Sequence, residues 1–393
     1  MPSGSREPLP EVRRIVLTNE NSSIDQGVSL RRLAGILVVV GGLLGVPQTT
    51  AAQNPCNSSP AAYDRGGKPH KTRLVNDPLF TKQWGLKQIN APGAWEQGAL
   101  GARAIIAIVD SGVDLRHPDL RRNLMKGTDI VGDAPGQECP GPQDPIGHGT
   151  HVAGIAAAVG DNRIGVVGVA PRARIMPVRV IRGDEQANEA LIESSERVAD
   201  GIRYAANHGA DVINLSLSTF WVTDNPLGGL SEAVEFAWRK GAVIVAAAGN
   251  DEDPICKYPA ADPLVICVAS TTQNREVASS SNAPFKPTDN VAVLAPGGQY
   301  AGNRDFCNQN DLVISTFLTR DEHDCGLVGY ATLWGTSLAA PHVSGIAALL
   351  SGRGLNNEQI VNCLLQTASN NGVYDSAMGY GIVNAAKAVR TCS

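Results

Sequence analysis

The stretch AIIAIVDSG at residues 104–112 decides the fold of this 393-residue chain. Residues 104–109 are all apolar and rich in β-branched side chains, which is typical of a parallel strand buried on both faces. The carboxylate of Asp110 and the flexible Gly112 follow at once, as where a strand ends and the chain turns. Because reactive groups in open α/β sheets gather at the carboxyl ends of strands, we expect Asp110 to belong to a functional site.

Similar short runs recur along the chain and alternate with segments of helical spacing. The expected strands are residues 104–109, 173–181, 211–217, 243–248, 264–269 and 291–294. The expected helices are residues 149–158, 189–207, 231–240, 338–350 and 357–366. Gly209 and Gly241 follow two of these helices, and glycine is a common helix stop. The alternation predicts an α/β fold: a doubly wound, mostly parallel sheet with helices on both faces.

The composition narrows the class of protein. Hydrophobic residues make up 43% of the chain and charged residues only 18%, which argues against intrinsic disorder. The 33 basic residues are outnumbered by 38 acidic ones, so the formal net charge is -5. A nucleic-acid-binding protein normally shows a basic surplus, and we therefore expect no nucleic-acid partner.

The N-terminal region has the order of an export signal. Arg31 and Arg32 precede an uncharged apolar stretch, residues 33–46, and the small residues Ala51 and Ala52 follow. The stretch is shorter than the ~18–20 residues that span a bilayer. We therefore predict a signal peptide at residues 28–52, a secreted protein (extracellular or in the cell envelope) and no stable membrane anchor; the alternative is a single membrane-spanning anchor.

The rest of the chain divides simply. Residues 1–52 form an N-terminal extension that includes the signal, and residues 1–27 are too polar for a signal start, so we suspect that translation begins downstream near Val28. Residues 53–76 are an irregular arm or short pro-segment. Residues 77–393 are expected to form one large domain, and we expect a monomer.

The eight cysteines predict disulfides, since the chain is expected to be exported. No two of them are spaced as C-x-x-C, so a zinc site is not expected. Eight cysteines allow about 105 pairings. Pairing by proximity in sequence gives Cys256–Cys267, Cys307–Cys325 and Cys363–Cys392, and leaves Cys56–Cys139.

Four short blocks carry the residues of a nucleophilic reaction. They are the strand end at Asp110, the sequence GHGTH around His148, the sequence GTSLAAP around Ser337, and the strand end AAAGN at Asn250. A serine hydroxyl is a weak nucleophile until a histidine takes its proton, and a carboxylate holds that histidine in the required tautomer. Asn250 and the main-chain N–H of Ser337 can donate to the oxyanion that develops in acyl transfer.

These blocks, in the order Asp, His, Ser, resemble the subtilisin-like serine proteases, the subtilase family. The resemblance covers about residues 77–386 and implies a secreted serine endopeptidase that hydrolyses proteins or peptides through an acyl-enzyme. It assigns Asp110 to orienting the imidazole, His148 to general base and acid catalysis, Ser337 to nucleophilic attack and Asn250 to the oxyanion hole.

Three alternatives remain beside this resemblance. A hydrolase of small esters or amides could use the same triad, although no G-x-S-x-G sequence surrounds Ser337. The second alternative is a non-catalytic binding module, but such a module has no need of the four residues assigned to catalysis above. His148 and His151 could instead be two metal ligands, but no Glu stands between them, and we expect His151 to be a packed helix residue.

The resemblance also implies one structural calcium ion. The corresponding positions offer two carboxylates, one amide oxygen and three main-chain carbonyls, a set that suits Ca²⁺. These residues are Asp77, Asp119, Val159, Asn162, Ile164 and Val166.

A substrate cleft follows from the same resemblance, in which an extended peptide adds as a strand beside residues 214–218. The expected substrate-binding residues are Ser216, Leu217, Ser218, Ala248, Gly249 and Lys257. The family commonly has Gly at the position of Ser218, which predicts a narrower cleft or altered hydrogen bonding.

Lys257 aligns with the base of the pocket for the side chain before the scissile bond, where a small residue is common. A buried cation there favours an acidic side chain. If Lys257 instead reaches solvent or pairs with Asp251 or Glu252, the pocket keeps an ordinary apolar preference.

Overall fold

The structure, a computed structural model, describes residues 75–132, 141–182, 190–218, 229–282, 291–300, 311–320, 322–323 and 327–392, without the side chains of residues 190–194 and 322–323. All of these belong to one compact unit, Val38–Ser393, and the second unit, Met1–Leu37, lies outside them. The predicted signal peptide, residues 53–74 of the arm, and the pairs Cys56–Cys139 and Cys307–Cys325 also lie outside the described residues.

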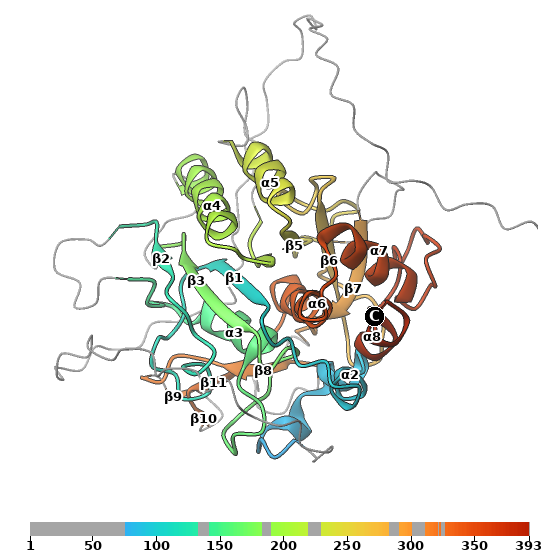
Figure 1. The fold of residues 1–393 in the computed structure, drawn as a ribbon, viewed down its shortest axis with the longest axis horizontal. Coiled ribbons are helices and arrows are strands. Elements are labelled where there is room, and N and C mark those ends of the chain that lie inside the picture. Colours follow the sequence, from blue (N-terminus) through green and yellow to red (C-terminus); the bar gives the residue numbers. More distant parts are fainter. Residues whose placement is uncertain are drawn as a thin grey trace, which may run out of the picture. The chain divides into compact units, whose positions relative to one another are not determined.

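The centre of the fold is a seven-stranded sheet with the order β2-β3-β1-β4-β5-β6-β7 (Figure 1). Every neighbouring pair is parallel, which confirms the predicted doubly wound α/β sheet. The strands are β1 Ile105–Asp110, β2 Thr128–Asp129, β3 Arg174–Arg179, β4 Val212–Leu215, β5 Val243–Ala247, β6 Val265–Thr271 and β7 Val291–Pro296. All six strands expected from the sequence are present, with ends shifted by a few residues.

Helices cover both faces of this sheet, and β1 shows why its sequence has no polar alternation. Ile106 and Ile108 pack into the core that contains α3 His148–Ala157 and α6 Thr336–Ser351. Ala107 and Val109 point to the other face, into the core with α4 Ala190–Asn207 and α5 Leu230–Arg239. All side chains of the strand after Ile105 are therefore buried, as expected for a parallel strand between two helical layers.

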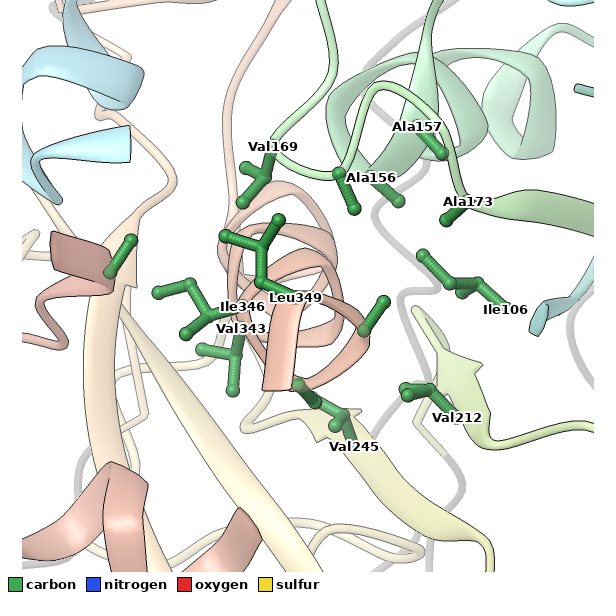
Figure 2. Packing of buried hydrophobic residues seen from close by; sticks show 14 of the residues in the cluster. Ile106, Ala156, Ala157, Val169, Ala173, Val212, Val245, Val343, Ile346 and Leu349 are labelled. Carbon is green, nitrogen blue, oxygen red and sulfur yellow. The ribbon is translucent and has the colours of Figure 1, made fainter. Parts of the chain in front are cut away.

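Helix α6 is the central helix of the molecule. It is apolar on every side, and all of its residues except Ser337 and Ser351 are buried. Figure 2 shows Val343, Ile346 and Leu349 of α6 packed among side chains from α3 and from the strands. A helix that is hydrophobic all round must be buried, and its single half-exposed residue near the N-terminus is Ser337.

Smaller elements complete the fold. They are η1 Phe80–Lys82, α1 Trp84–Gln88, α2 Ala91–Glu96, α7 Asn357–Thr367, α8 Ala385–Cys392, and the short strands β8 Val313–Thr316, β9 Glu322–His323, β10 Leu327–Val328 and β11 Tyr330–Leu333. The predicted disulfide Cys363–Cys392 joins α7 to α8, and Cys256–Cys267 is also present. In the described part of the chain, no helix is both long and apolar enough to cross a membrane.

Candidate active site

Three elements bring the predicted triad to the end of the sheet at which the parallel strands finish, called the sheet edge below. Asp110 is the last residue of β1, His148 is the first residue of α3, and Ser337 is the second residue of α6. Asp110 is fully buried, and its Oδ1 lies 2.8 Å from Nδ1 of His148. The same oxygen accepts a hydrogen bond from the main-chain N–H of Ser111 at 2.7 Å. Because the carboxylate faces Nδ1, that nitrogen carries the proton and Nε2 is left as the basic nitrogen.

The electrostatics of His148 favour its protonated form. Burial alone lowers the pKa of the imidazole, but the charge of Asp110 and its hydrogen bond outweigh burial, and the charge of Asp144 adds to them. The pKa of His148 is therefore raised above its ordinary value. An imidazole in this setting can accept a proton from a neighbouring hydroxyl and hold it.

Ser337 does not yet face the imidazole. Its hydroxyl donates a hydrogen bond to the main-chain carbonyl of Ser216 at 3.2 Å, and no hydrogen bond joins Ser337 to His148, both of which are described. Catalytic hydrogen bonds are often loose before substrate binds. Rotation about the Cα–Cβ bond of Ser337 is the change that can bring its hydroxyl toward the histidine.

A proline inside α6 leaves the main-chain carbonyl of Ser337 free to bond to the segment after β4. Pro341 has no N–H to donate to the carbonyl four residues earlier, which is that of Ser337. The hydroxyl of Ser216 donates to this carbonyl instead, at 2.6 Å. Asn214 then donates to Ser216 at 3.0 Å and accepts from Ser344 at 2.8 Å. This buried chain of hydrogen bonds fixes the start of α6 against the end of β4.

Asn250 is held so that its amide N–H groups are available. Its Oδ1 accepts hydrogen bonds from both the main-chain N–H and the hydroxyl of Thr336, at 2.9 and 3.1 Å. The hydroxyl oxygen of Thr336 in turn accepts from the N–H of Gly249 at 3.2 Å. With its oxygen engaged, Asn250 can present Nδ2 beside the N-terminus of α6, where the N–H of Ser337 has no partner within its helix.

Sequence reasoning missed a second buried carboxylate behind the histidine, that of Asp144. It is fully buried and accepts five hydrogen bonds, from the N–H groups of residues 146, 147 and 150 and from the hydroxyls of Ser111 and Thr150. Ser111 also accepts from the N–H of Gly149 at 3.0 Å. Asp144 therefore links the end of β1 to the start of α3. The signal in the sequence was an acidic residue four positions before His148, in a loop that ends in glycine.

The expected substrate-binding residues lie on both sides of the start of α6. Ser216, Leu217 and Ser218 continue the chain beyond β4, whereas Ala248 and Gly249 follow the adjacent strand β5. Lys257 pairs with Asp251, as one of the two alternatives expects, and its main-chain N–H donates to the carbonyl of Ala248. These segments are thus all at the same sheet edge as the predicted triad.

His151 takes the structural role expected of it. It is buried, and its Nε2 lies 3.1 Å from the carbonyl of Ala331. In the parts of the chain that are described, no three His, Cys, Asp or Glu side chains are close enough to hold a metal ion. Nothing in this geometry favours reading His148 and His151 as a pair of metal ligands.

The predicted calcium ligands meet around residues 159–166. Asp77 and Asp119 are both buried. Asp77 accepts from the N–H of Asp161 at 2.9 Å, and Asp119 accepts from the N–H of Val166 at 2.9 Å and from Nδ2 of Asn162 at 2.6 Å. Burial raises the pKa of Asp77, and burial together with the nearby Asp77 raises the pKa of Asp119 to about 6.

The donor set at this loop fits a hard cation. Within the described ranges, neither Asp77 nor Asp119 forms an ion pair with a basic side chain, and the carbonyls of Val159, Ile164 and Val166 accept no hydrogen bond. Carboxylate and carbonyl oxygens are what Ca²⁺ prefers. Asn162 can add a third kind of oxygen if its amide turns, since its Oδ1 now accepts from the N–H of Ile164.

Comparison with known proteins shows the family of the chain. The model of the Subtilase family, a family of S8 peptidases, matches residues 101–381. Thermitase from Thermoactinomyces vulgaris is 40% identical over 316 residues, which is 80% of this chain and 99% of the relative. Subtilisin BL from Lederbergia lenta is 36% identical over 309 residues, 78% of this chain and 98% of the relative.

Solved structures of proteases are similar to this chain as well. A protease structure from Pseudoalteromonas arctica matches with a TM-score of 0.67 and 30% identity, covering 81% of this chain and 99% of that one. The family model thus spans more than half of the chain, and the relatives match over nearly their whole length. The chain therefore belongs to the subtilase family of serine proteases.

Proposed function

We propose that this subtilase is a secreted, calcium-stabilised serine endopeptidase in which Asp110, His148 and Ser337 form the catalytic triad. The observation that carries the proposal is the hydrogen bond between buried Asp110 and His148 at the strand edge where α6 presents Ser337. A buried carboxylate that fixes the tautomer of an imidazole is the arrangement a serine nucleophile requires.

The reaction proceeds through an acyl-enzyme. Nε2 of His148 takes the proton of Ser337 as its Oγ attacks the peptide carbonyl carbon, which forms a tetrahedral oxyanion. Nδ2 of Asn250 and the N–H of Ser337 stabilise that oxyanion. His148 then gives its proton to the leaving amine as the C–N bond breaks. A water molecule hydrolyses the resulting ester of Ser337 by the same steps.

Peptide substrates bind beside the chain that follows β4. The buried Ser216 and the partly exposed Leu217 and Ser218 supply a segment to which an extended peptide can add as a strand, and Ala248 and Gly249 flank it from β5. The family membership implies protein substrates in general. An endopeptidase that reads main-chain hydrogen bonds in this way accepts unfolded polypeptide of many sequences.

A calcium ion stabilises the loop of residues 159–166. Asp77 and Asp119 would supply the charge, Asn162 would supply its amide oxygen after its amide turns, and Val159, Ile164 and Val166 would supply main-chain carbonyls. The ion compensates two buried carboxylates that have no cationic partner in the described part of the chain. Its role is structural, because these residues belong to a different loop from the triad.

We propose the chain organisation that the sequence predicts. Residues 1–52 contain the export signal at 28–52, residues 53–76 are a short arm or pro-segment, and residues 77–393 are the peptidase domain, which acts as a monomer. The disulfides Cys256–Cys267 and Cys363–Cys392 support export, because disulfides persist in oxidising compartments.

The decisive test uses purified mature protein in calcium, with casein, a serine-directed fluorophosphonate and the variant Ser337→Ala. We expect cleavage of casein, one label per molecule on Ser337, and a loss of activity on the order of 10⁶-fold in the variant, the size known for subtilisin. Labelling of Ser337 with hydrolysis of small esters alone would favour the esterase alternative. Absence of both label and hydrolysis would favour the binding module.

A further inference from the structure

Tyr330 is a buried tyrosine whose hydroxyl faces a predicted calcium ligand. It is the first residue of β11 (Figure 1) and is only 9% exposed. Its hydroxyl donates a hydrogen bond to Oδ2 of Asp119 at 3.2 Å, although the two residues are 211 positions apart in the chain. No step of the proposed reaction involves this tyrosine. A buried tyrosine hydroxyl usually finds a hydrogen-bond partner, and here the partner is a carboxylate that is expected to bind an ion.

The two oxygens of the Asp119 carboxylate have different partners. Oδ2 accepts from the hydroxyl of Tyr330 and from the main-chain N–H of Val166, whereas Oδ1 accepts from Nδ2 of Asn162. If the Asn162 amide turns to offer its oxygen to an ion, Oδ1 loses this donor and becomes available. Oδ2 keeps both of its donors. Because an ionised carboxylate has about four acceptor positions, these two hydrogen bonds leave room for an ion on the same group.

The ring of Tyr330 also packs against the loop of residues 159–166. A Cβ atom on Gly165 would overlap the ring and the hydroxyl of Tyr330, so the ring lies directly on the main chain of this loop. Gly165 also has a φ of +37°, which favours glycine. Its carbonyl accepts from the N–H of Leu79 at 2.7 Å, two residues after Asp77. Gly165 therefore contacts both Tyr330 and the segment that contains the other predicted carboxylate ligand.

A histidine fixes the position of Tyr330 relative to Asp119. Nδ1 of the buried His117 accepts from the main-chain N–H of Asp119 at 3.2 Å, so this nitrogen carries no proton. Nε2 therefore carries the proton and donates to the carbonyl of Gly329 at 2.8 Å. Gly329 directly precedes Tyr330, and the rings of His117 and Tyr330 meet at 90° with their centroids 5.3 Å apart. The hydroxyl is thus held in position before any ion binds.

We propose that Tyr330 is a positioning residue for the calcium site: its hydroxyl orients the carboxylate of Asp119 before the ion binds and thereby sets the affinity for Ca²⁺. This inference rests on the calcium ion of the proposed function. Groups that orient a metal ligand without touching the metal typically change the affinity by about 10–100-fold when they are removed. A carboxylate that is already oriented loses less conformational freedom on binding, so more of the interaction energy appears as affinity.

The test is the variant Tyr330→Phe, which keeps the ring beside Gly165 and His117 and removes only the hydroxyl. The purified mature protein is first inactivated at Ser337 with the fluorophosphonate, so that it cannot digest itself, and is then titrated with calcium chloride against a chromophoric chelator. We expect the variant to raise the Kd for calcium roughly tenfold. At one fixed calcium concentration, the rise in thermal midpoint that calcium produces should also be smaller in the variant.

Activity and a matched variant provide the controls. Tyr330 lies outside the predicted triad and oxyanion hole, so Tyr330→Phe that has not been inactivated should keep kcat within about twofold at saturating calcium. The matched variant is Tyr204→Phe, which removes a hydroxyl of α4 that donates to the carbonyl of Gly127 at 3.4 Å. It should keep the Kd for calcium within about twofold, because Tyr204 packs on the other face of the sheet.

Two results would overturn the inference. One is a Kd that Tyr330→Phe changes no more than Tyr204→Phe does, even if the thermal midpoint of the calcium-free protein falls; the calcium proposal would then stand without a role for Tyr330. The other is an unaltered protein that binds no calcium, which would overturn the calcium proposal as well. Failure of the proposed peptidase activity looks different, since Ser337 would then take no label and casein would not be cleaved.

Discussion

Two regions of this molecule bury pairs of carboxylates, and they treat that charge differently. At the sheet edge, Asp110 and Asp144 both act on His148 and raise the pKa of its imidazole, so a positive charge can form where the negative charges lie. Burial raises the pKa of Asp144, and around residues 159–166 it likewise raises the pKa values of Asp77 and Asp119, but no imidazole of the described residues pairs with those two carboxylates. The first region contains a histidine that can take up a proton, whereas in the described part of the chain no basic side chain pairs with Asp77 or Asp119.

This difference between the two regions predicts which substitutions affect catalysis and which affect stability. Changes at the sheet edge should alter the rate and its pH dependence. Changes around residues 159–166, which we call the calcium loop after the ion proposed to bind there, should alter the thermal midpoint and leave the chemistry of the folded enzyme nearly intact.

The largest expected effect comes from Asp110→Asn, which removes the charge that pairs with His148. An amide can hold the imidazole in the wrong tautomer, so we expect kcat to fall by about 10⁴-fold. Steady-state hydrolysis of a p-nitroanilide peptide measures it. The matched variant in the other region, Asp119→Asn, should keep kcat within about threefold when assayed well below its thermal midpoint. Similar losses of kcat in Asp110→Asn and Asp119→Asn would contradict the distinction between a catalytic and a stabilising region.

Asn250→Ala tests the contrast between the two regions at an uncharged side chain. It removes one donor to the oxyanion but no charge, so we expect kcat to fall by about 10²–10³-fold with little change in KM. Its control is Asn162→Ala, an amide of the calcium loop, which should leave kcat unchanged. A large change in KM for Asn250→Ala would instead point to a role in binding.

Removal of calcium should act on stability alone. A chelator should lower the thermal midpoint by several degrees, because an ion present at 100 times its Kd contributes ~2.7 kcal/mol. Differential scanning calorimetry with and without calcium measures the shift. In Asp119→Asn the two midpoints should nearly coincide; a calcium effect of full size in that variant would place the ion elsewhere.

The smallest effect is a shift in the pH profile. We expect kcat/KM to rise with pH as His148 loses its proton, with a midpoint above the ordinary histidine value of about 6.5, since the pKa is raised. Asp144→Asn removes a negative charge that favours the protonated imidazole, so the midpoint should fall by about 0.5–1 pH unit.

The same variant carries a structural cost. The side-chain NH₂ that Asp144→Asn introduces cannot accept the hydrogen bonds that the carboxylate now accepts, which should lower the free energy of unfolding by about 1–3 kcal/mol. Asp200→Asn is the control, because this carboxylate on α4 is 64% exposed. A midpoint that moves equally in both variants would show that Asp144 has no special influence on His148.

Much of the fold was predictable because it depends on runs of apolar residues. The six expected strands and five expected helices are present, since the strands lie in unbroken apolar runs and the helices are long enough for their period to show. The short elements were not predictable: β2, β9 and β10 have two residues each, and the four residues of β8 and of β11 include polar side chains, so neither forms an unbroken apolar run. Helix α8 was hidden by its small size and its many alanines.

The candidate site was predictable in part. Asp110, His148, Ser337 and Asn250 stand in distinctive blocks at the ends of strands and the starts of helices. The hydrogen bond from Ser111 to Asp144 and the one from Ser216 to Ser337 join distant segments, which local sequence does not reveal. The partners of Lys257 were narrowed to acidic neighbours, but only the structure shows that Asp251 and Asp253, held by Asn282, are the two that approach its ammonium.

The burial of α6 on all sides has a consequence for local unfolding. Amide hydrogens exchange with solvent only when a segment opens, and a central helix surrounded by packed side chains opens only with the whole domain. Ser337 is therefore attached to what should be the slowest-exchanging segment of the molecule. Heating should then abolish activity and native structure in a single transition, with no temperature at which the nucleophile is lost from an otherwise folded enzyme.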